Sequence, residues 1–171
     1  LRWEGKFTVL SAGRLVPEKG VLEILKAAAM WDKKITLAVA GVGPMEDEVK
    51  SYAKRFKNIF YLGHLDSREM PLYYSAADIL VIPSVHEEGF GRVILESLAC
   101  GTPVIGSNRG AIPEAMDETV GKLITVTPQN IRSSVEYFFK NREQLAKLSR
   151  KARSFAERKY SKDNVEKIIS V

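Results

Sequence analysis

The sequence predicts an α/β domain in which helices cover both faces of an open, parallel sheet of six strands. Short apolar segments, which read as buried strands, alternate with segments whose apolar residues recur at helical spacing. No linker, low-complexity tract or internal repeat interrupts this alternation. The length of 171 residues suffices for a sizeable core and predicts a single domain, residues 1–171. Together these observations indicate βαβ units, whose strands lie parallel and are covered on both sides.

Three strand–helix units occupy the first half of the chain. Strands are predicted at 6–13, 34–41 and 58–63. The segments with helical spacing lie behind them, at 19–31, 44–56 and 67–77. Pro44, followed by acidic residues, is typical of a helix start. Ser67, with Met70 behind it, is expected to cap the third helix.

The second half continues the alternation and then ends in helices alone. Strands are predicted at 78–84, 102–107 and 121–126, with a helix at 91–100 between the first two. The remaining helices are expected at about 128–140, 142–158 and 162–170. Because strand–helix–strand crossovers are right-handed, we expect a Rossmann-like domain with the common strand order 3-2-1-4-5-6 and extra C-terminal helices.

Composition is that of an ordinary soluble globular protein from a reducing compartment. Hydrophobic residues make up 45% and charged residues 27% of the chain. The single cysteine, Cys100, excludes an internal disulfide. No apolar run approaches the roughly 20 residues that a membrane span needs, and the start has no signal-peptide pattern. We therefore expect a cytoplasmic protein, and because a strand begins almost at once, one domain of a larger polypeptide.

Basic residues are concentrated near the C-terminal end. Residues 140–167 hold ten Lys or Arg and four Asp or Glu, a net charge of +6, whereas the whole chain carries +5. Solvated helix faces explain this best, because Leu145, Leu148, Ala152 and Phe155 form an ordinary buried stripe. Peripheral contact with an anionic surface at the inner face of a membrane is the alternative. Nucleic acid is not expected as a partner, because no aromatic residues interleave with the charges.

Two unusual loops follow the first and fourth strands. In the expected order the sheet reverses direction between these strands, and ligands of open α/β sheets bind beyond the carboxyl ends at such a point. Residues 13–20, GRLVPEKG, form the first loop, and residues 83–91, PSVHEEGFG, form the second. The fold is therefore expected to bring both loops to one ligand site.

The first loop contains residues suited to a phosphate. Gly13 allows close backbone approach, and Arg14 can grip phosphate oxygens with two hydrogen bonds. Lys19 and Gly20 stand at an expected helix start, where a cation opposes the helix dipole unless an anion lies between the cation and the free amides. For this loop taken alone, plain surface charges explain the pattern equally well.

The second loop and its helix carry two glutamates separated by seven residues. Glu96 stands among apolar residues, and because a buried carboxylate needs partners, a purely solvated role fits it poorly. Glu88 precedes the helix, so capping is its alternative role. Gly89 and Gly91 leave backbone amides unobstructed. Two carboxylates for sugar hydroxyls, beside two cations for phosphates, describe a site for a sugar nucleotide.

Other kinds of site fit the sequence less well. There is no Walker loop and no Gly-x-Gly-x-x-Gly after the first strand, and GVGP at 41–44 lacks the third glycine. His64 and His86 lie in separate loops and Cys100 at an apolar helix end, which does not favour a nucleophilic triad. No metal-ligand cluster or Asp-x-Asp pair stands out, so we expect no metal and no cofactor beside the substrate. The tyrosines and Met70 are interpreted as core or surface residues.

Four segments in fixed order resemble the donor-binding, C-terminal domain of family four glycosyltransferases, which have the GT-B architecture. They are GRLVPEKG, GVGP, FYLGHLDSREMPLYYSAADILVIPS and EEGFGRVILESLACGTPVIGSNRGAIPE. The resemblance runs from about Lys6 to Val171 and implies one half of a GT-B fold. It also implies a retaining hexosyltransferase that uses a nucleoside-diphosphate sugar. The acceptor domain of such an enzyme precedes this domain, and without it we expect the chain to be inactive.

The resemblance also implies roles for individual residues. Arg14 and Lys19 are implied to bind the donor diphosphate, and Glu88 is implied to contact the transferred sugar, so these three are the expected catalytic residues. Glu96 is implied to accept hydrogen bonds from the ribose hydroxyls. The loop at 63–65 is implied to border the nucleobase. The remaining expected donor contacts are Gly13, Gly63, His64, Leu65, Gly89, Phe90 and Gly91.

The sequence departs from the family pattern at two places. Arg92 stands where many relatives carry leucine, and Gly110-Ala111 replaces paired glycines; both are expected to tune the donor. Two other functions stay open, namely a GT-B enzyme of another reaction type, such as a sugar-nucleotide epimerase or a phosphorylase, and a non-catalytic module that binds nucleotide sugars. The presence of all four charged residues of the family site favours the transferase over the module; these are Arg14, Lys19, Glu88 and Glu96.

Overall fold

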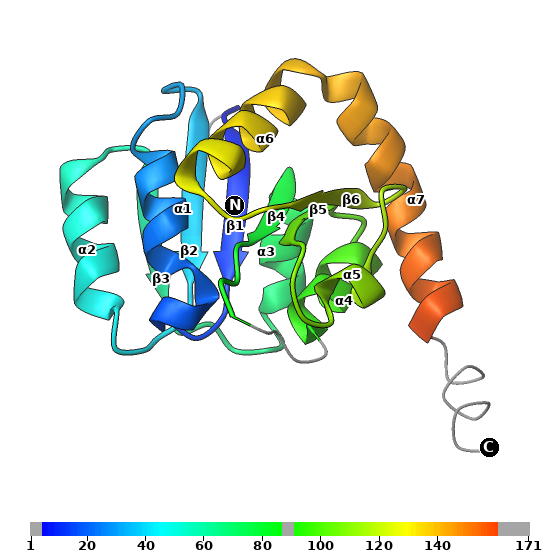
Figure 1. The fold of residues 1–171 in the computed structure, drawn as a ribbon, viewed down its shortest axis with the longest axis horizontal. Helices are drawn as coiled ribbons and strands as arrows, with labels where there is room; N and C mark the ends of the chain where they lie inside the picture. The colour runs from blue at the N-terminus through cyan, green and yellow to red at the C-terminus, as the bar shows by residue number, and fades with distance from the viewer. Residues whose placement is uncertain (1–4, 87–90, 161–171) are drawn as a thin grey trace.

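The computed structural model of the chain describes residues 5–86 and 91–160. Its six strands form one sheet in the order β3-β2-β1-β4-β5-β6 (Figure 1), and all neighbouring pairs are parallel. The predicted parallel sheet and its strand order are therefore confirmed. The order reverses between β1 and β4, which pair through Val9 with Ile79 and Leu10 with Leu80.

All six predicted strands are present, and each is shorter than predicted by one or two residues at one or both ends. The strands are β1 (Phe7–Ala12), β2 (Ile35–Ala40), β3 (Ile59–Gly63), β4 (Ile79–Ile82), β5 (Val104–Ser107) and β6 (Gly121–Ile124). The helices are the 3-10 helix η1 (Pro17–Lys19), α1 (Val21–Ala28), α2 (Glu46–Arg55), α3 (Met70–Ala76), α4 (Arg92–Ala99), α5 (Ile112–Ala115), α6 (Pro128–Lys140) and α7 (Arg142–Tyr160).

Three helix predictions are corrected by the structure. The helix expected over 19–31 is the shorter helix α1, which begins only at Val21, because Gly20 adopts a left-handed conformation with φ 67° between η1 and α1. Helix α3 begins at Met70 without a side-chain cap, so Ser67 does not cap it. The single turn α5 has no counterpart among the predicted helices. The helix expected over 162–170 lies outside the described residues.

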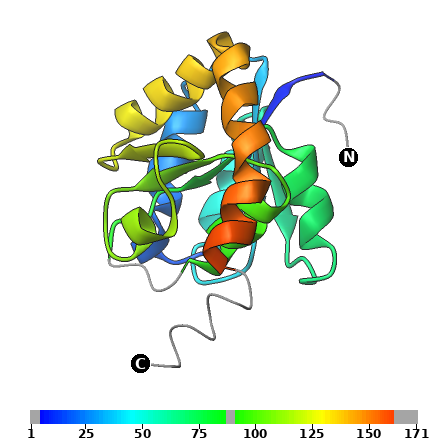
Figure 2. The same ribbon diagram turned by 90° about the vertical axis from the view of Figure 1, so that its right-hand side faces the viewer.

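Two hydrophobic clusters hold the helices against the two faces of the sheet. Buried residues of α1, α2 and α6 belong to the cluster on one face, and buried residues of α3, α4 and α5 belong to the other. The long helix α7 joins both clusters, through Leu148 near its start and Phe155 near its end. Figure 2 turns the right-hand side of Figure 1 toward the viewer and shows α7, in orange and red, running along it. Helices cover both faces of the sheet, as predicted.

Candidate functional site

A crevice opens at the carboxyl ends of β1, β2 and β4, where the strand order reverses. It consists of a first cavity of about 460 Å³ and a second cavity of about 540 Å³. The residues that line both cavities are Ala12, Gly13, Arg14, Ala40, Arg92 and Val93. The two cavities therefore adjoin, and they occupy the place that the strand order predicts for a ligand.

Backbone contacts hold the loop after β1 against the loop after β4. The amide of Val85 donates to the carbonyl of Glu18 at 2.9 Å. Gly20 lies so close to Pro83 that a Cβ at position 20 would be 1.8 Å from the Pro83 carbonyl oxygen. Only glycine fits at this contact, which also requires a positive φ. The two loops singled out in the sequence thus meet at one side of the first cavity.

The GVGP loop at 41–44 supports the first loop from the other side. Leu15 donates its amide to Val42 at 2.9 Å and accepts the amide of Met45 at 3.0 Å. A Cβ at Gly41 would be 1.8 Å from the carbonyl oxygen of Gly13, and one at Gly43 would be 2.5 Å from that of Leu15. Close packing of two backbones therefore accounts for these glycines.

Three cations reach the crevice from its two sides. Arg14 is exposed and lines both cavities, while the half-buried Lys19 lines the first. Lys19 ends η1 and directly precedes Gly20, the N-cap residue of α1, so it lies beside a helix start as expected, although not within α1 itself. Arg92 is the first residue of α4 and lines both cavities. A cation there opposes the dipole of α4 unless an anion lies beside it, so the arrangement suits a phosphate group.

Glu96 lies in the second turn of α4 and lines the second cavity. The sequence disfavoured a purely solvated role for Glu96 because its neighbours in the chain are apolar, but the structure shows an exposed side chain. Ile94 and Leu98 are buried, whereas Glu96 is on the exposed side of the same helix. Its carboxylate is therefore available to a ligand in the second cavity.

Tyr74 of α3 is the partner of this carboxylate that the sequence did not reveal. Its side chain is fully buried, and its hydroxyl donates to Oε2 of Glu96 at 2.9 Å. Tyr74 also lines the second cavity, so its interpretation as a core or surface residue was incomplete. The two residues are 22 positions apart and on different helices, and no spacing rule links them. Only the packing of α3 against α4 brings them together.

The segment after β3 borders the second cavity. Gly63 ends β3 with a φ of 71°, and its carbonyl accepts the amide of Gly41 at 2.7 Å. His64 and Leu65 line the second cavity, together with Asp66 and Ser67. The segment expected at a nucleobase therefore lies in the same cavity as Glu96.

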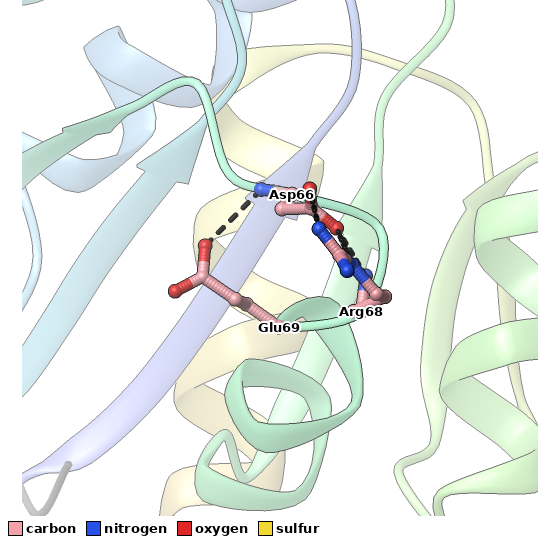
Figure 3. A network of polar contacts seen from close by, with 3 residues as sticks. All are labelled: Asp66, Arg68 and Glu69. Atoms are coloured by element: carbon pink, nitrogen blue, oxygen red, sulfur yellow. Dashed lines mark hydrogen bonds and ion pairs between the residues drawn. The ribbon is translucent and has the colours of Figure 1, made fainter.

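A polar network shapes the turn that leads into α3 (Figure 3). The carboxylate of Asp66 accepts hydrogen bonds from the amide and guanidinium of Arg68 at 2.9 to 3.1 Å. The amide of Asp66 donates to the carboxylate of Glu69 at 3.2 Å. Hydrogen bonds from Arg68 hold the pKa of Asp66 below its usual value. This turn, and not a Ser67 cap, starts the helix.

Three predicted site residues, Glu88, Gly89 and Phe90, lie outside the described residues. Gly91 is described: it adopts a left-handed φ of 57° before α4 and lines the first cavity. Within residues 5–86 and 91–160, no group of three or more His, Cys, Asp or Glu side chains is placed to hold a metal ion. In the same part of the chain, no helix has both the length and the apolar character that a membrane crossing requires.

Comparison with known sequences identifies relatives over most of the chain. Residues 1–155 match the family described as Glycosyl transferases group 1. A glycosyltransferase of Methanocaldococcus jannaschii is 29% identical over 166 residues, which cover 93% of this chain and 42% of that protein. A glycogen synthase of Mycobacterium tuberculosis is 36% identical over 118 residues, which cover 66% of this chain and 28% of the synthase. The chain thus spans less than half the length of both relatives.

Solved structures show the same fold. The C-terminal domain of a glycosyl transferase group 1 protein from Francisella tularensis superposes with a TM-score of 0.80 at 29% identity, over 91% of this chain and 87% of that one. The Anabaena protein HepE in complex with UDP gives a TM-score of 0.86 at 24% identity, over 98% of this chain and 50% of that one. This chain therefore belongs to the glycosyl transferases group 1 family, as a domain that corresponds to the C-terminal, donor-binding half of GT-B glycosyltransferases.

Proposed function

We propose that this chain binds the nucleoside-diphosphate sugar of a hexosyltransferase that retains the configuration of the transferred sugar. One observation carries this proposal: the crevice at the strand reversal holds Arg14 and Lys19 in its first cavity and Glu96 in its second. Cations suit phosphate oxygens, and an exposed carboxylate suits sugar hydroxyls. The crystal structures of HepE with UDP and with UDP-glucose support a donor of this class.

The diphosphate, the ribose and the base of the donor are each assigned to one part of the crevice. Arg14 and Lys19 bind the diphosphate in the first cavity, beside Gly13 and the start of α4. Glu96 binds the ribose in the second cavity, and the segment 63–65 borders the base. Glu88, with the amides of the segment 89–91, contacts the transferred sugar.

The reaction follows from the charge that develops as the donor breaks. The bond between the anomeric carbon and a diphosphate oxygen cleaves, which leaves positive charge on the sugar ring and negative charge on the diphosphate. Arg14, Lys19 and the N-terminus of α4 stabilise the departing diphosphate. The acceptor oxygen attacks the anomeric carbon from the same face and gives its proton to a phosphate oxygen. This route needs no separate protein base and retains the configuration.

We further propose that the acceptor is bound by an N-terminal domain outside residues 1–171 of this chain. The relatives are more than twice as long as the segments that match, which supports a second domain. A Streptococcus pneumoniae relative, 37% identical over 108 residues, is an alpha-monoglucosyldiacylglycerol synthase. A cytoplasmic enzyme at the inner face of a membrane, with basic helices toward anionic lipid, would suit an acceptor of that kind.

A ligand panel tests the proposed function. UDP, GDP and ADP, their hexose conjugates and free sugar phosphates are titrated into the chain by calorimetry, with and without a chelator. We expect one nucleoside diphosphate and its hexose conjugate to bind, and to bind equally well in the chelator, because Arg14 and Lys19 oppose the phosphate charge. Preference for a free sugar phosphate would instead indicate a phosphorylase. Binding that requires a divalent ion, or no binding of any nucleotide, would contradict the proposal.

A further inference from the structure

We propose that Tyr74 is a positioning residue for donor recognition, which holds the carboxylate of Glu96 in the orientation that the ribose requires. Its hydroxyl donates to Oε2 of Glu96 at 2.9 Å, and both residues line the second cavity. One carboxylate oxygen is thereby anchored to the protein, and the other is left for the ligand. The inference rests on the proposed function, since it takes Glu96 as the ribose ligand.

The two partners differ in burial in the way that such a role requires. Tyr74 is fully buried, whereas Glu96 is exposed to the crevice. An exposed glutamate samples several rotamers, and a ligand that needs one of them must order the side chain on binding. A hydrogen bond from a rigid donor restricts the carboxylate before the ligand arrives.

Tyr74 itself is fixed by a second set of hydrogen bonds. The hydroxyl of Thr102 donates to the backbone carbonyl of Tyr74 at 2.7 Å, and the hydroxyl of Ser97 donates to the carbonyl of Thr102 at 3.0 Å. All three side chains are buried. These bonds join α3, α4 and the segment between α4 and β5. They do not involve the Tyr74 hydroxyl, so they are expected to survive its removal.

The hydroxyl of Tyr74 acts as a donor throughout the neutral range. Burial, and then the neighbouring charge of Glu96, raise the pKa of Tyr74 above its ordinary value. The phenol therefore keeps its proton, and Glu96 is an acceptor both for Tyr74 and for hydroxyl groups of a ligand. Two vicinal ribose hydroxyls and one tyrosine can be satisfied by one carboxylate, because it has about four lone-pair sites.

A double-mutant cycle in the 171-residue chain tests the inference. The parent, Tyr74→Phe, Glu96→Ala and the double variant are titrated by calorimetry with two probes. One probe is whichever of UDP, GDP and ADP binds the parent most tightly, and the other is inorganic pyrophosphate, which has no ribose. We expect Tyr74→Phe to weaken nucleotide binding by about threefold to tenfold and Glu96→Ala to weaken it further. The double variant should bind like Glu96→Ala, and pyrophosphate should bind equally to all four proteins.

Tyr61→Phe is the matched control. Tyr61 also ends in a hydroxyl that donates at this edge of the sheet, but its acceptor is the carbonyl of Gly41, at 3.1 Å, and not Glu96. It should keep the nucleotide affinity of the parent, and melting temperatures show that each variant is folded. Nucleotide affinity unchanged in Tyr74→Phe, or lowered equally with and without Glu96, would overturn the inference and leave the proposed function standing. If Glu96→Ala itself binds nucleotide like the parent, the ribose assignment fails instead.

Discussion

At the scale of single residues, the two glutamates are assigned to different parts of the donor. We predict that Glu96→Gln weakens binding of both the nucleoside diphosphate and its hexose conjugate by roughly tenfold, because both ligands carry the ribose. Glu88→Gln should weaken only the hexose conjugate. Calorimetry with both ligands measures the difference, with Glu136→Gln on the distant helix α6 as a control that removes the same charge. Equal losses for the plain diphosphate in both variants would contradict this division.

The buried hydroxyl of Tyr74 predicts a loss of stability in alkali. Because burial and Glu96 raise its pKa in the folded chain, the unfolded chain loses this proton first as the pH rises above about 10. The free energy of unfolding therefore keeps its full value at neutral pH. Above about pH 10 it falls, by up to about 1.4 kcal/mol per pH unit. Urea unfolding between pH 8 and 11 should show a steeper decline for the parent than for Tyr74→Phe. Parallel curves would show that Tyr74 ionises normally in the folded chain.

The sequence predicted which charged residues would lie at the crevice, but it did not predict their exposure or their side-chain partners. Arg14, Lys19 and Glu96 were expected at one site because strand order decides which loops meet, and they do line adjoining cavities. The exposure of Glu96 was missed, because an apolar neighbourhood in sequence says little about which side of a short helix faces solvent. The contact with Tyr74 was missed because it depends on the packing of two helices. The donor contacts themselves remain predictions.

At the scale of elements, the junction between η1 and α1 depends on one glycine. Gly20 has a φ of 67°, and a Cβ there would be 1.8 Å from the Pro83 carbonyl oxygen. We predict that Gly20→Ala lowers the free energy of unfolding by about 2–4 kcal/mol, because left-handed strain adds to a clash between two backbones. It should also weaken nucleotide binding, since Lys19 precedes the junction. Urea unfolding and calorimetry measure the two effects.

Gly101→Ala is the matched control for this junction. Gly101 also has a positive φ, of 81°, but a Cβ there would meet nothing within 4 Å. Only the strain of a left-handed alanine is expected, about 1–2 kcal/mol. If Gly20→Ala were no more damaging than Gly101→Ala, the contact with Pro83 would not be what holds the two loops together.

Element order was more predictable than element ends. The strand order follows from right-handed crossovers, which leave few arrangements for alternating strands and helices. Local conformations that depend on the surroundings were not apparent, such as the break at Gly20 and the turn in which Arg68 and Glu69 engage Asp66. The turn α5 has only four residues, too few to show a helical period.

At the scale of the whole molecule, the proposed function makes the crevice one wall of a site whose other wall is the acceptor domain. We predict that the 171-residue chain binds its donor but does not glycosylate an acceptor. Positioning of two reactants accounts for roughly 7–11 kcal/mol of a transfer barrier, and a half-site without an acceptor wall forfeits most of it. Addition of the proposed N-terminal domain on the same polypeptide should restore transfer and tighten donor binding. Transfer by the present chain at ordinary enzymatic rates would contradict its interpretation as a donor half.

The central claim is that Arg14 and Lys19 bind the diphosphate of a nucleotide, and calorimetry of three variants tests it most directly. Arg14→Ala, Lys19→Ala and Arg132→Ala each remove one positive charge, but Arg132 lies on α6 and pairs with Glu136 at 2.8 Å. With the best of UDP, GDP and ADP as ligand, the first two variants should each lose about 1.5–3 kcal/mol of binding free energy, roughly tenfold to over a hundredfold in affinity. Arg132→Ala should bind like the parent, and all three should melt at the parent's temperature. Parental affinity in both Arg14→Ala and Lys19→Ala would contradict the claim.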